Sequence, residues 1–308
     1  MIQPMIRFAW SLVLIGMLRP ALALADDYEV INPRLGYQAL IADPRLSEIS
    51  GLAVSRQHDN LIWVHNDGGN PSTLFGISPA GEVRVTLEVR TPNQDWEDLA
   101  LVRDGERWLL LIADTGDNGG LRNQLRIIAV EEPSDLSVTA VNPVWVQSFR
   151  WPDGPRDCEA MTVDPVNREL LLISKKRVPP ELFRLPLRGS KPGEVVTAEL
   201  LGLLPGVGQP DADDLRRNPV FGRYRAQVSG ADLSPNGRLL AVLNYRQVIV
   251  YDRRDGDSWT SALKRPPAAF SYPWLPQAEA IGFLPDSRSV LIGSEKLPTP
   301  ILRLRVVD

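Results

Sequence analysis

Short apolar runs alternate with polar turns along most of the chain, and one arrangement of them occurs five times. Each copy begins at an acidic or amide residue, passes through a short apolar run and a turn, and enters a second apolar run that ends in a polar residue. The copies are EISGLAVSRQHDNLIWVHND, DWEDLALVRDGERWLLLIADTGDN, DCEAMTVDPVNRELLLISKK, QVSGADLSPNGRLLAVLNYR and QAEAIGFLPDSRSVLIGSEK. Runs of this length between Gly, Pro, Asp and Asn are typical of β-strands. The pattern predicts a repeated pair of strands.

Three polar positions keep a nearly constant spacing within this repeat. The ring positions are Ser50, Glu97, Glu159, Ser229 and Glu279, and two residues before them lie Glu48, Asp95, Asp157, Gln227 and Gln277. The strand-end positions, which close the second run, are Asn66, Asp114, Lys175, Tyr245 and Glu295. The ring and strand-end positions are 16, 17, 16, 16 and 16 residues apart. A register kept five times indicates a structural repeat.

Further short apolar runs follow each pair. LFGISP, LRIIAV, LFRLPL, VIVYDR and ILRLRV supply a third strand, and VRVTLEV, VWVQSFRW, TAELLGLL and SALKRPPAAF supply a fourth in four of the copies. Four antiparallel strands in about 50 residues predict a β-propeller blade. We therefore predict an all-β fold, a single five-bladed β-propeller, with a six-bladed propeller as the alternative. A solenoid would need capping repeats, which the pattern does not show.

The fifth copy reaches Asp308 without a fourth strand. The segment GYQALIAD, which starts at Gly36, is available to complete that blade. Such a closure would remove the open edges of a linear array. The loop PGVGQPDADDLRRNPVFGRYRA, from Pro205, is too long for a simple turn and is expected to cover one face.

The N-terminus has the pattern of an export signal. The basic segment MIQPMIR precedes the apolar run FAWSLVLIGML, and Ala23-Leu24-Ala25 forms a small-residue cleavage pattern. The apolar run is too short to span a bilayer as an anchor. We expect residues 1–25 to be a signal peptide and residues 26–308 to be a periplasmic or secreted propeller domain with no membrane insertion. Its one cysteine, Cys158, excludes an internal disulfide.

Composition removes several classes of function. The net charge of −4 is spread along the chain without a basic stripe, which argues against nucleic acid as a partner. Two histidines do not suit a His-based metal centre. The chain has neither a G-x-S-x-G elbow nor an H-E-x-x-H motif. Any catalysis would depend on carboxylates or on a metal-activated water.

The ring positions are the first candidate site. The first strand of each propeller blade lines the central channel, so Glu97, Glu159 and Glu279 should converge there. A cation, protonation or hydrogen bonds would have to relieve their repulsion. Hard oxygen ligands favour calcium or magnesium, and we predict calcium. The alternative is a structural latch, in which each acid only binds the backbone of the next blade.

The turns after the second strands are the second candidate site. NDGGN, DTGDN and SKKR occupy equivalent places, and DTGDN lacks the alternating acids of an EF-hand loop. The predicted ligand-binding residues at the channel mouth are Asn66, Asp67, Asp114, Lys175, Lys176, Tyr245, Arg246 and Glu295. Acids and bases around one opening suit a small polar or anionic ligand. Ordinary turn chemistry and solvated surface charge are the alternatives.

The blade starts ISGLAV, WEDLAL, CEAMTV, VSGADLS and AEAIGF resemble those of the SdiA-regulated family of exported bacterial propellers. The resemblance covers residues 36–308 and implies Ser, Glu, Glu, Ser and Glu at the ring positions. Family blades often have Gly after the ring Glu, whereas this chain has Asp98, Ala160 and Ala280. The chain is more distantly similar to phytase-like and gluconolactonase-like propellers, which implies calcium at the channel mouth.

Three functional hypotheses follow. The leading one is a binding module that holds a divalent cation through Glu97, Glu159 and Glu279 and a small polar ligand beside it. The second is a metal-dependent hydrolase of a phosphoester or lactone, with Asp114 or Glu295 as the base. The third is a protein-interaction scaffold with a latched channel and no ligand. The sequence names no protein partner.

Overall fold

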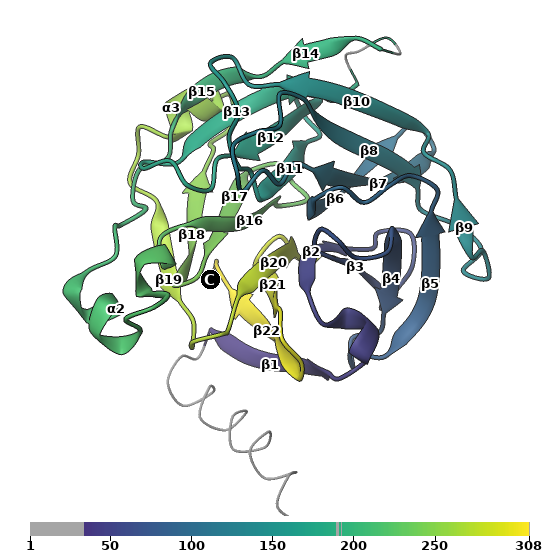
Figure 1. Cartoon of the computed structure of the whole chain (residues 1–308), viewed down its shortest axis with the longest axis horizontal. Helices are drawn as coiled ribbons and strands as arrows, with labels where there is room; N and C mark the ends of the chain where they lie inside the picture. Colours follow the sequence, from purple (N-terminus) through teal and green to yellow (C-terminus); the bar gives the residue numbers. More distant parts are fainter. Residues whose placement is uncertain (1–33, 189–190, 192, 308) are drawn as a thin grey trace, which may run out of the picture.

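Five β-sheets surround a central axis in the computed structural model of the chain, which describes residues 34–307 except 189, 190 and 192 (Figure 1). The predicted five-bladed β-propeller is confirmed, so the six-bladed alternative does not apply. The expected signal peptide, residues 1–25, lies outside the described residues. No helix in the described part of the chain is long and apolar enough to cross a membrane.

The blades follow one another along the chain, and each starts with the strand nearest the channel. Blade 1 contains β2 (Ile49–Val54), β3 (Ile62–Asn66), β4 (Thr73–Ile77), β5 (Val83–Val89) and β9 (Ala140–Val141). Blade 2 contains β6 (Trp96–Asp104), β7 (Arg107–Asp114), β8 (Leu125–Glu131), β10 (Trp145–Arg150) and β14 (Val195–Thr197). Blade 3 contains β11 (Ala160–Asp164), β12 (Glu169–Ile173), β13 (Glu181–Pro186) and β15 (Glu199–Leu203). Blade 4 contains β16 (Val228–Leu233), β17 (Leu239–Asn244), β18 (Gln247–Asp252) and β19 (Ala268–Ser271).

Blade 5 joins the two ends of the described chain. It contains β20 (Ala278–Phe283), β21 (Ser289–Ser294), β22 (Thr299–Arg305) and, at its outer edge, β1 (Leu35–Ile41). The strands β1 and β22 run antiparallel, with Leu35 opposite Leu304 and Ile41 opposite Thr299. Figure 1 shows this pair as purple beside yellow. The predicted closure by the N-terminal strand is therefore confirmed, and it leaves β22 without an open edge.

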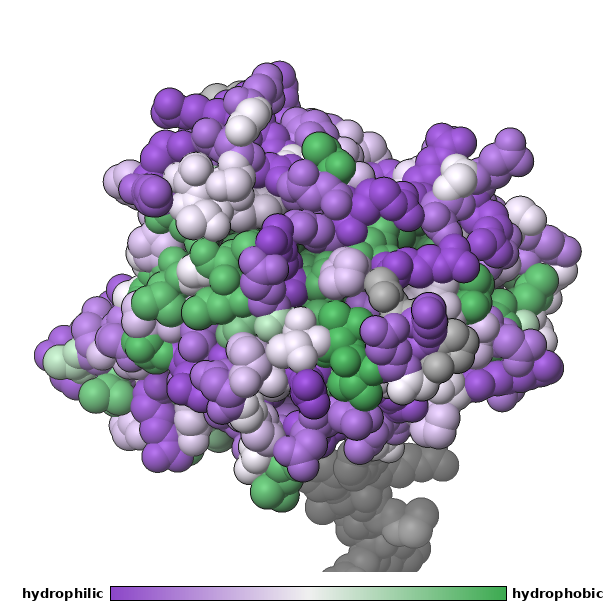
Figure 2. Space-filling view, turned by 90° about the horizontal axis from the view of Figure 1, so that it is seen from above, coloured by the Kyte–Doolittle hydropathy of each residue, from purple (hydrophilic) through white to green (hydrophobic). Residues whose placement is uncertain are grey.

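Burial changes from the channel outwards. The second strands β3 and β21 are buried throughout, whereas the outer strand β5 alternates between buried and exposed side chains. The apolar clusters lie between neighbouring blades, and one of them packs Trp63 of blade 1 near Trp96 of blade 2. Figure 2, an edge-on view, shows apolar side chains in the middle of this face with polar ones above and below. The apolar runs in the sequence predicted strands because the strands near the channel are buried on both faces and the outer strands on one face.

The long loop from Pro205 carries two short helices, α2 (Ala212–Arg217) and η2 (Gly222–Tyr224). Asp211 caps α2 by accepting from the backbone N–H groups of its first turn. An ion pair of 3.1 Å between Arg246 and Asp214 ties α2 to the turn after β17. The other short helices, η1 (Pro44–Leu46) and α3 (Trp259–Ala262), lie outside this loop. The loop borders the channel mouth, as the next section describes.

Candidate functional site

Four of the five ring positions are β-bulges. The pairing of the first strand with the second shifts between Ile49 and Gly51, Trp96 and Asp98, Val228 and Gly230, and Ala278 and Ala280. The residue inside each shift is the ring residue, and in blade 3 Glu159 directly precedes β11. A bulge leaves one residue out of the ladder and redirects its side chain. The constant polar position in the sequence is thus the mark of a repeated bulge.

The two ring serines act as latches between blades. The Ser50 hydroxyl donates to the carbonyl of Glu97 at 2.6 Å, and the Ser229 hydroxyl donates to the carbonyl of Ala278 at 2.7 Å. Both hydroxyls are buried, so each bond satisfies polar groups that water does not reach. The latch alternative therefore describes the serines.

Two of the ring glutamates have partners from the strand-end positions. Glu159 forms a buried ion pair with Lys175 of its own blade. Glu279 accepts a hydrogen bond of 2.6 Å from the Tyr245 hydroxyl of the neighbouring blade. The Glu159–Lys175 pair forms because the second strand of blade 3 returns antiparallel to the first, whereas the Tyr245–Glu279 bond crosses from blade 4 to blade 5.

Glu97 is different from the other ring residues. Its side chain is 3% exposed, and no described residue gives its carboxylate a hydrogen bond or an ion pair. Burial raises the pKa of this carboxyl well above its usual value, and the nearby Asp67 raises it further. A buried carboxylate without a partner is costly for a folded protein. It needs a proton or a cation.

Glu97 belongs to two groups of carboxylates whose oxygens lie within 4.8 Å of one another. One group is Asp67, Asp95 and Glu97; the other is Glu97, Asp157 and Glu159. Lys175 and Lys176 pair with Glu159 and Asp157, the second pair at 2.9 Å. Among the described residues, none forms an ion pair with the first group. That group therefore lacks a directly paired cationic side chain when its carboxyls are ionised.

The first group is also held in an environment that disfavours charge. Burial raises the pKa of Asp67 to about 7, and it also raises the pKa of Asp95. The Asp67 carboxylate accepts only from the backbone N–H of Gly68, at 2.5 Å. A bound cation would reverse this effect, because opposite charge favours the ionised form.

Two glycines leave the space that these carboxylates occupy. A methyl group on Gly68 would overlap with Asp95, and one on Gly116 would overlap with both Asp95 and Glu97. Neither glycine has a positive φ that would itself require glycine. The turns NDGGN and DTGDN therefore supply room for carboxylates rather than a chelating loop of their own.

Two further buried carboxylates, Asp98 and Asp232, accept hydrogen bonds from the first strands of several blades. Asp98 is fully buried and accepts from the backbone N–H groups of Leu99, Met161 and Ala231, at 2.8, 2.8 and 3.1 Å. Asp232 accepts from the N–H of Phe283 at 2.7 Å. The sequence analysis did not assign these roles, although Asp98 was noted in place of the expected glycine. The structure explains this departure, since Asp98 joins three blades.

Several predicted mouth residues are engaged in the fold. Asp114 is fully buried between Arg122 and Arg126, and its pair with Arg122 measures 2.8 Å. The Asn66 amide donates to the carbonyl of Arg45 at 2.7 Å, and Arg246 is paired with α2. These contacts position the turns. They leave Asp114 without a free oxygen for proton abstraction.

Glu295 lies beside Glu279 rather than in the carboxylate groups around Glu97. Burial raises the pKa of Glu295 to about 9, and the neighbouring Glu279 contributes to the increase. Glu295 therefore holds its proton more tightly than an isolated carboxyl does, which suits a donor better than a base. Glu279 appears in neither carboxylate group of the described residues.

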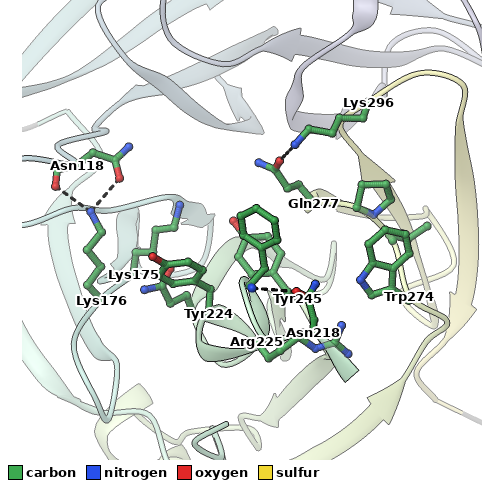
Figure 3. A pocket seen from close by; sticks show the side chains of 14 residues that line it. Asn118, Lys175, Lys176, Asn218, Tyr224, Arg225, Tyr245, Trp274, Gln277 and Lys296 are labelled. Carbon is green, nitrogen blue, oxygen red and sulfur yellow. Dashed lines mark hydrogen bonds between the residues drawn. The ribbon is translucent and has the colours of Figure 1, made fainter. Parts of the chain in front are cut away.

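A cavity of about 560 Å³ opens above the cluster, at the same mouth. Lys175, Lys176 and Tyr245 line it, as the sequence predicted for a ligand site. Figure 3 shows Lys175 and Lys176 on one side of the cavity and Trp274 and Lys296 on the other, with Tyr245 between them. The repeat pattern did not predict the lining residues Asn118, Asn218, Phe221, Tyr224, Arg225, Trp274, Leu275 and Pro276. Most come from the loop after Pro205 and from the segment before β20, where no repeat marks them.

The chain matches no protein-family model and no curated protein. Among solved structures, it is similar to a luciferin-regenerating enzyme at a TM-score of 0.44 and 8% sequence identity, over 86% of this chain and 94% of that chain. A likeness this distant carries no argument about chemistry. The resemblance to the SdiA-regulated family stays a prediction from sequence.

Proposed function

We propose that the protein binds a divalent cation, calcium, at the channel mouth and holds a small polar ligand above it. The observation that carries this proposal is Glu97, a buried carboxylate without a partner that joins two carboxylate groups. A cation there would compensate three carboxylates that no lysine or arginine of the described chain pairs with. It would also remove the need to protonate them.

The donor set favours calcium. All candidate ligands are carboxylate oxygens, which suit hard cations. The carboxylates come from three blades, so no single loop holds their oxygens in a regular octahedron. Calcium accepts six to eight oxygen ligands in flexible arrangements, whereas magnesium requires near-octahedral geometry and retains water. Ligand atoms of the bound molecule would complete the shell.

The proposed ligand set differs from the one that the sequence suggested. Glu97 and Glu159 stay in it, and Asp67, Asp95 and Asp157 join them. We leave Glu279 out because it belongs to neither carboxylate group of the described residues. This difference makes Glu279 a useful control, since it has the same residue type at the same repeat position.

The test is thermal melting of the mature chain in EDTA and in millimolar calcium. If calcium is present at 100 times its Kd, it adds about 2.7 kcal/mol to the free energy of unfolding. In a protein of this size, we expect the melting temperature to rise by about 5 °C or more. Glu97→Gln should lose most of this rise, while Glu279→Gln should keep it.

Two results would contradict the cation site. One is a wild-type melting temperature that neither calcium nor magnesium changes. The other is an equal calcium response in Glu97→Gln and the wild type. Gly116→Ala provides a variant without a charge change, and we expect it to weaken the response because the methyl group displaces Asp95 and Glu97.

A metal-dependent hydrolase of a phosphoester or lactone is the second candidate. The raised pKa of Glu295 favours it, because a carboxyl that holds its proton more tightly can protonate the leaving group of a substrate that reaches past the cavity lining. If so, hydrolysis of 4-nitrophenyl phosphate or a small lactone in calcium should fall at least tenfold in Glu295→Gln. If the wild type hydrolyses neither substrate, the hydrolase is contradicted and the proposed function is the binding module alone.

We also propose that the protein acts outside the cytoplasm. The support is the sequence pattern of residues 1–25, which ends in Ala23-Leu24-Ala25. Mass spectrometry of the protein recovered from a fractionated bacterial host tests this proposal. Recovery outside the cytoplasm with Asp26 as the first residue supports it, and an intact N-terminus in the cytoplasm contradicts it.

A further inference from the structure

The cavity above the carboxylate cluster has an unusual lining. Among the described residues that line it, four are cationic and none is Asp or Glu; the cations are Lys175, Lys176, Arg225 and Lys296. The acidic groups lie below this layer. The mouth is therefore arranged in two levels, with carboxylates at the bottom and cationic side chains around the opening.

The cationic groups have partners that a ligand can replace or share. Lys176 donates to the carbonyl and the side-chain oxygen of Asn118 at 2.9 and 2.8 Å. Lys296 donates to the side-chain oxygen of Gln277. Both lysines are exposed, and Figure 3 shows them on opposite sides of the opening. The neutral amide of Gln277 competes weakly with an anion for the Lys296 ammonium group. Lys176 also pairs with the Asp157 carboxylate at 2.9 Å, and an anion would share the ammonium group with that carboxylate.

The second feature of the opening is its aromatic side chains. Trp274 and Phe221 are 61% and 62% exposed, and Tyr224 and Tyr245 line the same cavity. Trp is on average a well-buried residue type, so an exposed Trp in a concave site is informative. Aromatic faces stack on flat rings, and this contact contributes beyond the area that it buries.

We propose that the cavity takes an organic anion that carries an aromatic ring. The ring lies against Trp274 or Phe221, and the anionic group reaches Lys296 or Lys176. The volume of about 560 Å³ fits a small molecule, because typical ligand pockets measure about 300 to 1,000 Å³. This inference deepens the proposed function by naming its ligand class, and the ligand's anionic oxygen can also reach the proposed cation.

The ion pair between Lys176 and Asp157 connects the two levels. It measures 2.9 Å, and Asp157 belongs to one of the carboxylate groups around Glu97. An anion that attracts Lys176 releases Asp157 toward the proposed cation. We therefore expect calcium to tighten anion binding and the anion to tighten calcium binding, by the same factor.

Three probes separate the features of the ligand. Phenyl phosphate has both the ring and the anion, inorganic phosphate has only the anion, and phenol has only the ring. Titration calorimetry of each with the mature chain, in EDTA and in calcium chloride, gives the affinities. We expect phenyl phosphate to bind at least tenfold more tightly than either of the other probes, and more tightly still in calcium.

Two substitutions assign the contacts. Trp274→Ala should weaken phenyl phosphate at least fivefold and leave phosphate unchanged. Lys296→Met should weaken both anions. Lys264→Met is the matched control, because Lys264 is an exposed lysine that does not line the cavity. Both positions in the cavity are exposed, so the variants should fold.

The failures of the two proposals are distinguishable. A calcium-dependent rise in melting temperature without binding of phenyl phosphate overturns only the ligand class. Binding of phenyl phosphate without any calcium response overturns only the cation site. Two results overturn the inference that the ligand carries an aromatic ring. One is equal affinity for phenyl phosphate and phosphate, and the other is binding of glucose 6-phosphate but not of phenyl phosphate.

Discussion

Asp98 shows how much one side chain can connect in the channel. It belongs to blade 2, and its carboxylate accepts from the backbone of blades 3 and 4 as well as its own. Burial raises its pKa well above the usual value, while the three N–H donors act in the opposite direction. The residue therefore satisfies backbone groups that the converging first strands cannot pair with each other.

Asp98→Ala should destabilise the protein by about 3 kcal/mol, because it leaves the N–H groups of Met161 and Ala231 buried without acceptors. Asp98→Asn keeps one acceptor oxygen and should cost less. Urea unfolding of the two variants and the wild type measures the difference. Equal stability of Asp98→Ala and the wild type would show that the three bonds contribute nothing net.

The sequence predicted the ring positions but not which of them lack partners. Glu159 and Glu279 look like Glu97 in the repeat, yet Glu159 is paired by the strand-end residue of its own blade and Glu279 by that of the preceding blade. Lys175 and Tyr245 supply a charge and a hydroxyl, whereas Asp114, the equivalent residue of blade 2, is turned to Arg122 and Arg126. Such pairings depend on side-chain directions at a bulge, which strand periodicity does not encode.

At the scale of elements, the alternating pattern was sufficient for the blades. The inner strands pair in the predicted order, and β1 closes blade 5. The short strands β9 and β14, which run parallel to β5 and β10, were not predicted because they come from the long connections between strands. The cavity wall after Pro205 was anticipated only as a loop over one face, since no repeat specifies its side chains.

A chain that starts at Pro44 tests the closure. It lacks β1, which buries Leu35, Ala39 and Ile41 against blade 5. Their burial contributes about 4 kcal/mol, so we expect the melting temperature to fall by about 10 °C. A synthetic peptide of residues 34–42 should restore it, and the same peptide with Ala39→Lys and Ile41→Lys should not. Unchanged melting without β1 would contradict its role in closure.

At the scale of the whole molecule, the channel concentrates buried acids with raised pKa values. Burial raises the pKa of Asp232 to about 6, of Asp67 to about 7 and of Glu295 to about 9. The unfolded values lie near 4. The folded chain therefore binds more protons than the unfolded chain between these limits. This contribution to stability is fully present below about pH 4 and is lost as the pH rises through 6 to 9.

We predict that the melting temperature in EDTA falls from pH 5 to pH 9. Each group lowers the free energy of unfolding by at most about 1.4 kcal/mol per pH unit. Glu295→Gln resembles the protonated side chain and should flatten the decline between pH 7 and pH 9. Asp135→Asn is the control. The backbone N–H of Ser137 lowers the pKa of this exposed aspartate, so its titration does not change the stability above pH 5. Calcium should reduce the decline, since it binds the ionised acids. A melting temperature in EDTA that rises from pH 5 to pH 9 would mean that these acids are ionised in the folded protein without a cation.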